Sequence, residues 1–147
     1  TNSPAEISSW GVSVGAQTKI FGNFDLSANY TKSKLEFEQD LYPDFRTNWN
    51  TPEHKIKAQF GNTSLFENFG FNVAWRYWSE YLWQASFGDG MVPETHVLDA
   101  QINLTVPKWK STIKVGATNL GGEEYFTAFG SGFIGTQYYI SWTANNF

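Results

Sequence analysis

The sequence contains no cysteine, so no disulfide framework holds this chain together. It is also poor in charge, because charged residues make up 16% of its 147 residues against about a quarter in average soluble domains. It has no run of about 18 apolar residues, which excludes a transmembrane helix. With a net charge of −4 there is no basic patch, and we expect no nucleic-acid partner.

Aromatic residues are abundant, at 18% of the chain, yet the mean hydropathy is −0.40. The two values agree if apolar and polar residues alternate, because a membrane-spanning β-strand is apolar on one face only. The start of the chain has no basic segment followed by an apolar core, and residues 1–6 have the composition of a loop. An exported barrel begins with a signal peptide, so we expect that processing or truncation has removed the true N-terminus.

Alternation with a period of two dominates the chain and predicts strands longer than those of soluble proteins. In the first segment Trp10, Val12 and Val14 share a face opposite Gly11 and Ser13. The predicted strands are residues 10–20, 24–31 (with weaker alternation to 37), 55–60, 69–83, 98–106, 113–118 and 138–145.

The connections between these segments are alternately short and long. The first short one, 21–23, contains Gly22 and Asn23, which tolerate positive φ. Outer-membrane barrels have short periplasmic turns and longer external loops. We therefore expect the loops 38–52, 85–93 and 121–135 to be extracellular and the C-terminus to be periplasmic.

Charged side chains separate cleanly between the two predicted faces. Those on the polar face are Lys19, Asp25, Lys55, Lys57, Arg76, Glu80, Asp99 and Lys114. Lys32 is the exception, late in its strand and so near the outer rim. A cation facing lipid costs about 2–4 kcal/mol at the bilayer midplane, which explains the separation. Apolar-face aromatics also recur near the predicted strand ends, as in interfacial girdles: Trp10, Phe24, Phe69, Phe71, Tyr81, Trp83 and Tyr138.

The C-terminal half resembles the end of TonB-dependent outer-membrane receptors. The resemblance is carried by 96–101 (His-Val-Leu-Asp-Ala-Gln), 113–120 (ending in Asn-Leu), 124–125 (Glu-Tyr) and 135–147, with 50–55 (Asn-Thr-Pro-Glu-His-Lys) upstream. The loop sequences are closest to the Bacteroidetes branch. Residues 50–147 match by motif and 1–49 only by pattern.

This resemblance implies an all-β fold, an antiparallel transmembrane β-barrel segment in which residues 1–147 supply about seven C-terminal strands of a 22-stranded barrel. The plug domain and earlier strands would lie outside this sequence. The implied partners are outer-membrane lipid, the protein's own plug and remaining strands, TonB, the barrel-insertion machinery and a small nutrient ligand. The C-terminal insertion signal would comprise Tyr138, Ile140, Trp142 and Phe147, although Phe147 has the parity of the polar face unless a bulge intervenes.

No constellation indicates an enzyme, a cofactor or a metal. The two histidines, His54 and His96, are expected to be solvated residues at loop edges, and Glu94 beside His96 adds too few ligands for a metal. No nucleophile lies in a triad-like context, and no helix follows the glycines of 116–135.

Five residues are candidates for substrate binding. Arg76, Trp78 and Glu80 are expected to project into the lumen and to contact substrate or plug. The alternative is a cross-strand ion pair that stabilises the wall, with Asp99 or Lys57. Phe126 and Phe129 belong to a set of loop aromatics that either form an external binding surface or pack the loops together.

The sequence thus predicts an outer-membrane receptor that takes up a nutrient (a siderophore, vitamin, glycan or peptide) with TonB-coupled energy. Two alternatives remain open. A passive porin or structural barrel would share every strand feature, and a soluble β-sandwich binding module would share the alternation.

Overall fold

The computed structural model describes residues 6–144 and consists almost entirely of antiparallel strands. The strands are β1 (Ser8–Ile20), β2 (Phe24–Glu36), β3 (His54–Phe66), β4 (Phe69–Trp78), β5 (Tyr81–Ala85), β6 (Gly88–Val92), β7 (Thr95–Val106), β8 (Ser111–Thr118) and β9 (Gln137–Ala144). Two short 3-10 turns, η1 (Gln39–Leu41) and η2 (Pro107–Trp109), complete the elements. Within the described part of the chain, no helix is long and apolar enough to cross a membrane.

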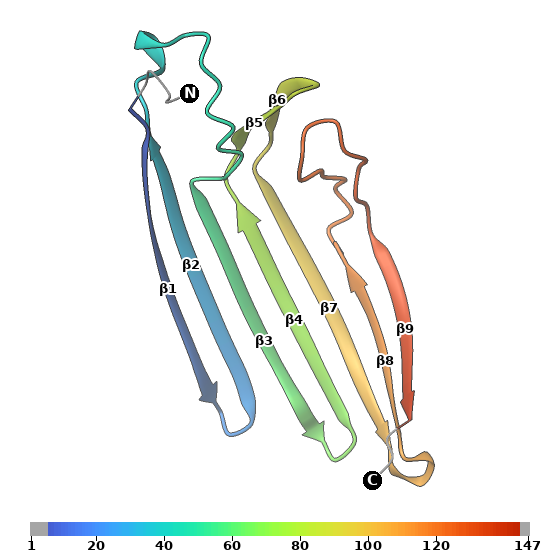
Figure 1. Ribbon diagram of the computed structural model, residues 1–147. Coiled ribbons are helices and arrows are strands. Elements are labelled where there is room, and N and C mark those ends of the chain that lie inside the picture. The colour runs from blue at the N-terminus through green and yellow to red at the C-terminus, as the bar shows by residue number, and fades with distance from the viewer. Residues whose placement is uncertain (1–5, 145–147) are drawn as a thin grey trace.

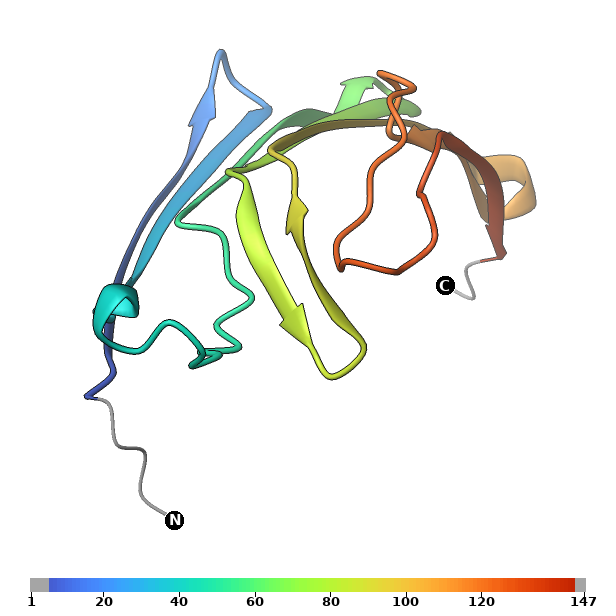
Figure 2. The ribbon, with the colours of Figure 1, turned by 90° about the horizontal axis from the view of Figure 1, so that it is seen from above.

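Seven strands form one sheet in the order β1-β2-β3-β4-β7-β8-β9, and β5 pairs only with β6 (Figure 1). The predicted seven-stranded antiparallel sheet is therefore confirmed. The sheet is curved but not closed, since β1 and β9 form its two edges among residues 6–144 (Figure 2). The short connections lie at one end, here called the turn end, and the long ones at the other, the loop end.

Strand pairing keeps one register across the sheet. Ala58 of β3 lies opposite Ala28 of β2 and Trp75 of β4, and Trp75 in turn lies opposite Leu98 of β7. A register shift between Asn62 and Phe66 is the irregularity in the β3–β4 pair. Because side chains alternate between faces along each strand, this register extends each face from β1 to β9.

The convex face is apolar and largely uncovered. Its exposed side chains include Trp10, Val12, Val14, Leu26, Tyr30, Leu98, Ile102, Leu104, Val115, Tyr138, Ile140 and Trp142. Near the turn end Phe60 stacks on Phe24 at 5.4 Å and meets Phe71 edge-on at 5.6 Å. Soluble monomers rarely expose a contiguous apolar patch above a few hundred Å², whereas these exposed apolar side chains extend from β1 to β9.

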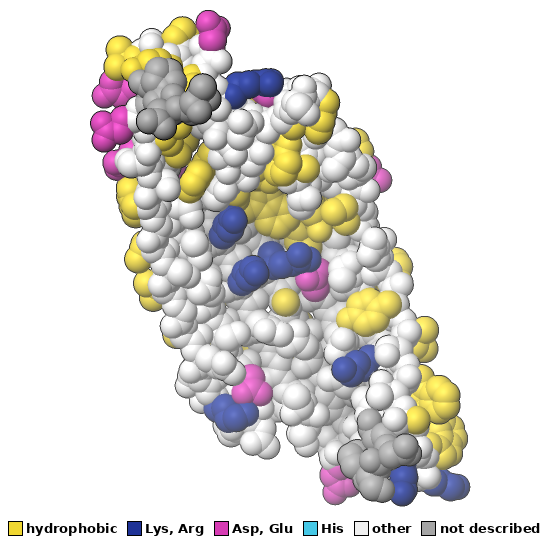
Figure 3. Space-filling model, viewed as in Figure 1, with side chains coloured by type: hydrophobic (Ala, Val, Ile, Leu, Met, Phe, Trp, Pro, Cys, Tyr) yellow, Lys and Arg dark blue, Asp and Glu magenta, His cyan; other side chains and the backbone are white. Residues whose placement is uncertain are grey.

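The concave face is polar, and Figure 3 views it directly. Lys19 and Asp25 form an ion pair at 2.7 Å near its turn end. Farther along, Tyr139 lies over Gly116, where an added Cβ would stand 2.4 Å from the tyrosine oxygen. The Tyr139 hydroxyl donates to Gln101 at 2.8 Å, so glycine at 116 makes room for a cross-strand aromatic.

Both histidines lie at the start of a strand beside a connection, as the sequence predicted, with His96 exposed and His54 half-buried. His54 begins β3 and stacks on Tyr30, whose hydroxyl lies 2.8 Å from Nδ1. His96, in β7, stacks on Trp75 with ring centroids 5.7 Å apart. Both belong to an aromatic band on the convex face near the loop end, where Trp10 also lies beneath the Lys32 ammonium at 5.7 Å.

Four predictions were wrong in detail. The predicted strand 69–83 ends at Trp78, so Tyr81 and Trp83 belong to a separate hairpin and not to a girdle, and the predicted loop 85–93 is mostly the β5–β6 hairpin. In the first turn the positive φ angles fall on Phe21 and Gly22, not on Asn23. Strand β2 continues to Glu36 and places Lys34 opposite Trp10, which adds a second cation to the apolar face near the loop end.

Candidate functional site

Three segments at the loop end fold over the concave face and contact one another (Figure 2). They are the β2–β3 connection (37–53), the β5–β6 hairpin (81–92) and the β8–β9 connection (119–136). We call them together the loop cap. The cap arises because β4 stops at Trp78 and the chain leaves the sheet before forming β5.

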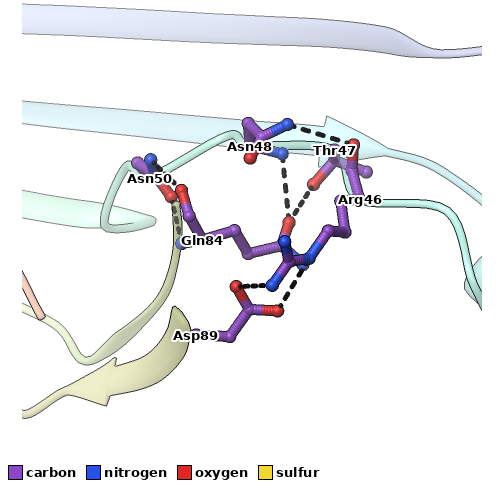
Figure 4. A network of polar contacts seen from close by, with 6 residues as sticks. All are labelled: Arg46, Thr47, Asn48, Asn50, Gln84 and Asp89. Carbon is purple, nitrogen blue, oxygen red and sulfur yellow. Dashed lines mark hydrogen bonds and ion pairs between the residues drawn. The ribbon is translucent and has the colours of Figure 1, made fainter. Parts of the chain in front are cut away.

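The β2–β3 connection is bound to the hairpin through Gln84 (Figure 4). Asn50 pairs with the Gln84 backbone as a strand would: its side-chain oxygen accepts from the Gln84 amide at 2.7 Å, and its nitrogen donates to the Gln84 carbonyl at 2.9 Å. The Gln84 side-chain oxygen accepts in turn from the Asn48 amide at 3.0 Å and the Thr47 hydroxyl at 3.3 Å.

An ion pair reinforces the same contact. The Arg46 guanidinium donates to both carboxylate oxygens of Asp89, with Nε 3.1 Å from Oδ2. Such fork-like pairing fixes orientation as well as distance. Because both side chains are about a third or more exposed, its main effect is on geometry, and the free energy it adds is small.

The β8–β9 connection packs on the other side of the hairpin. The Phe129 ring covers Gly90, where an added Cβ would stand 2.1 Å from the ring, and Phe87 of the hairpin lies against Gly130. The Tyr81 hydroxyl donates to the Thr127 carbonyl at 2.7 Å. Burial raises the pKa of Tyr81 above its usual value, which extends the pH range over which this hydroxyl can donate.

Asp99 joins the concave face to the loop cap. Its Oδ2 accepts from Arg76 Nη2 at 2.8 Å, and its Oδ1 accepts from the Asn119 backbone amide at 3.1 Å. Asn119 has a left-handed φ of 55°, and its side chain donates to the Glu123 carbonyl at 2.8 Å. The Thr136 hydroxyl donates to the Asn119 carbonyl at 2.6 Å. Asn119 therefore holds the first and last residues of the β8–β9 connection together.

Beneath the cap lies a pocket of about 250 Å³, which we call the basic pocket. Its concave-face lining comes from Lys55 and Lys57 of β3 and from Arg76 and Trp78 of β4, while Asn50 and Tyr81 belong to the cap. In Figure 3 basic side chains gather at mid-height on this face. The pocket is thus basic on one side and aromatic on another.

Of the five predicted substrate-binding residues, the structure brings Arg76 and Trp78 into one pocket. Arg76 also forms an ion pair with Asp99, which is one of the two partners named in the alternative of a cross-strand ion pair. Glu80 follows the end of β4, is exposed and does not line the pocket. Phe126 packs edge-on against Phe133 at 5.5 Å and Phe129 covers Gly90, which matches the alternative that loop aromatics pack the loops together.

The residues of the predicted insertion signal lie elsewhere. Tyr138, Ile140 and Trp142 share the convex face of β9 and are 80%, 75% and 69% exposed. Phe147 lies outside the described residues, so the expectation that it has the parity of the polar face stays a prediction. The described part of the chain contains no group of acidic residues and histidines suited to a metal.

Sequence reasoning missed the cap contacts of Arg46, Asn50, Gln84 and Asp89. They lie in segments without periodicity, where spacing gives no information about partners. The one available signal was the asparagines of the β2–β3 connection, since Asn48 and Asn50 both adopt positive φ, a conformation that asparagine tolerates better than most residues.

Comparison with solved structures shows what this sheet is similar to. The siderophore receptor PiuA from Acinetobacter baumannii matches 95% of this chain with a TM-score of 0.68 and 17% sequence identity. The match covers 20% of that receptor, so the chain spans about a fifth of the length of this structural neighbour. No protein-family model and no curated protein matches the sequence.

We expect Asp99→Ala to loosen the β8–β9 connection, because it removes the acceptor for both Arg76 and the Asn119 amide. The expected loss is about 1–2 kcal/mol, the lower part of the range for charge-assisted hydrogen bonds, because the pair is partly exposed. Hydrogen exchange should speed up across 119–136 in the intact protein. Asp25→Ala breaks the more exposed pair with Lys19 and should leave this exchange unchanged; equal effects would contradict the account.

We expect Asn50→Ala to free the β2–β3 connection from the hairpin. Protease sensitivity should rise in both 37–53 and 81–92, since the two hydrogen bonds to the Gln84 backbone are lost together. Asn48→Ala is the matched control: Asn48 has a similar φ of 49°, but its side chain bonds only within its own segment, to the Arg46 carbonyl. If the two variants are cleaved alike, backbone strain and not the Asn50–Gln84 pairing holds the cap.

Proposed function

We propose that this chain is a segment of the β-barrel wall of an outer-membrane receptor that takes up a nutrient with TonB-coupled energy. One observation carries the proposal: the seven-stranded sheet, with one apolar and one polar face, matches part of a siderophore receptor over 95% of its length. The nutrient belongs to one of the classes that such receptors carry, a siderophore, vitamin, glycan or peptide. The resemblance of the loops to the Bacteroidetes branch stays a prediction.

The convex face fits contact with lipid. Its apolar side chains remain exposed from β1 to β9, and water would make so large an apolar surface prone to association. Strands of 8 to 13 residues match the roughly 9–11 needed to cross a bilayer when tilted. The band of Trp10, Tyr30, Trp75 and Tyr77 near the loop end and the phenylalanines near the turn end fit the two interfaces.

The arrangement of connections supports an orientation. The loop end carries the long connections that form the cap, and the turn end carries the short ones. By the usual pattern of outer-membrane barrels, the loop end is extracellular and β9 runs toward the periplasm. The polar concave face then lines the lumen.

The remainder of the barrel would complete the sheet. An unpaired strand edge in lipid leaves backbone groups without hydrogen bonds at a cost of several kcal/mol each, so we propose that other strands of the same protein pair with β1 and β9. The full protein would be a barrel of about 22 strands with a plug domain that contacts TonB. The exposed aromatic face of β9 would be the part recognised by the barrel-insertion machinery.

A passive porin or structural barrel is the second candidate, because it would share the sheet and both faces. The loop cap favours the receptor, since three connections folded over the concave face obstruct an open channel and offer a surface for capture. A soluble β-sandwich binding module has less support, because residues 6–144 contain no second sheet that packs on the convex face.

Energy coupling tests the function directly. In cells that depend on this protein for a nutrient, deletion of TonB or collapse of the proton gradient should reduce uptake to background while surface binding persists. A control porin in the same cells should keep its permeability. Uptake that survives both treatments would favour the passive barrel and reject the receptor.

Lipid contact is tested by a charge placed on either face of β2. We expect Ala28→Arg, midway between Phe24 and Lys32 on the convex face of β2, to cost about 2–4 kcal/mol and to lower the amount of folded protein in the outer membrane, as expected for arginine near the bilayer midplane. Ser27→Arg, one residue away on the concave face, should be tolerated. Folded yield can be measured by heat-modifiable gel mobility, and equal tolerance of the two arginines would contradict a lipid-facing convex surface.

A further inference from the structure

The basic pocket holds more positive charge than its surroundings neutralise. Lys57 lies directly opposite Arg76 in the β3–β4 register, and like charges in that position are destabilising. Asp99 pairs with Arg76, but Lys55 and Lys57 have no ion pair among residues 6–144. Three cations and one carboxylate leave two positive charges in excess.

The pocket is also rich in free donors and short of free acceptors. Arg76 Nε and Trp78 Nε1 are buried and find no acceptor within the described part of the chain. The acceptors nearby are already used, since the Asn50 side chain pairs with Gln84 and the Thr127 carbonyl accepts from Tyr81. Buried donors normally find a partner, so this pocket needs hydrogen-bond acceptors that residues 6–144 do not provide.

The neighbouring acidic residues do not fill this need. Glu53 lies 3.4 Å from Lys32 and 3.8 Å from His54, and Glu94 accepts from the Tyr77 hydroxyl at 3.5 Å. These partners belong to the convex face. Although the chain is acidic overall, with a net charge of −4, the basic pocket keeps an excess of positive charge.

We propose that the basic pocket is an anion-binding subsite that takes the acidic group of a small ligand, a dicarboxylate or a phosphate. Its roughly 250 Å³ is below the 300–1,000 Å³ of pockets that enclose whole ligands, so it holds the acidic part of a larger molecule. Lys55 and Lys57 supply the charge, Arg76 is kept in place by Asp99, and Trp78 and Tyr81 form the aromatic wall.

The position of the pocket fits this role. It lies under the loop cap, and Asn50 and Tyr81 of the cap belong to its lining. A ligand that enters from the loop end would meet the cap first and these cations next. The inference rests on the proposed function for the assumption that the concave face lines a space open to solutes.

The test is equilibrium binding of defined anions to the purified intact protein in detergent. Succinate, phthalate and inorganic phosphate serve as probes, with Trp fluorescence and calorimetry as readouts, since Trp78 lines the pocket. At least one probe should bind, and its binding should weaken as salt increases, as exposed charge interactions do. The pattern of binding identifies the acidic group that the subsite prefers: binding of phosphate alone indicates a phosphate, binding of phthalate alone indicates an aromatic dicarboxylate, and binding of both succinate and phthalate indicates dicarboxylates in general.

The deciding variant is Lys55→Met/Lys57→Met, which removes the two unpaired charges and keeps much of their aliphatic length. Binding should fall roughly 10-fold or more, the effect expected for losing a charge-assisted contact. Lys114→Met is the matched control, because Lys114 lies on the same face outside the basic pocket. Far-UV circular dichroism and heat-modifiable mobility check that both variants fold.

Three results would overturn the proposal. The first is no binding by any probe, and the second is equal loss in Lys55→Met/Lys57→Met and Lys114→Met. The third is carbodiimide cross-linking of Lys57 to an acidic residue of the same intact protein, which would assign the pocket to a protein segment. Because this assay needs no energy source, anion binding without TonB-dependent uptake would refute only the proposed function, and uptake without charge-dependent binding would refute only the subsite.

Discussion

Backbone hydrogen bonding in one register, carried from β1 across to β9, is the constraint on which the rest of this structure depends. A slip of one residue in any strand would turn its apolar side chains to the polar face. The register places Leu26, Phe60 and Val73 in one row, and neighbouring strands continue such rows. Both the apolar convex surface and the basic pocket exist because this order is kept.

The loop cap is joined to the sheet by several contacts, among them a backbone hydrogen bond from Leu120 to the Leu98 carbonyl at 2.7 Å and the edge-on packing of Trp78 against Tyr125. Asp99 adds a charged contact, since it links a cation of the concave face to the amide that begins the β8–β9 connection. Asn119 then ties both ends of that connection together. The basic pocket and the β8–β9 connection are therefore in contact at two points, through the Asp99 carboxylate and through Trp78 against Tyr125.

The sequence predicted the sheet well because alternation is a local signal. Residue parity predicted the seven-stranded sheet and most of the separation of charge. It also offered Asp99 and Lys57 as partners in the alternative of a cross-strand ion pair, and Asp99 is the one that pairs with Arg76. The sequence failed where parity carries no information. The break after Trp78 and the hairpin that follows come from contacts with distant segments, such as Gln84 with Asn50 and Gly90 with Phe129. For the site, Arg76 and Trp78 were identified, but Lys55, Lys57 and Tyr81 were not, since their convergence depends on that hairpin.

The most direct test of the account is a scan of single cysteines carrying spin labels along β7 in the outer membrane, made possible by the absence of native cysteine in this sequence. Oxygen collisions report lipid exposure, and a water-soluble nickel complex reports aqueous exposure. The account predicts that oxygen accessibility peaks at Leu98, Ile102 and Leu104, and nickel accessibility at Asp99, Gln101 and Asn103, with opposite phase. Accessibility to nickel on both faces would contradict a membrane-spanning wall.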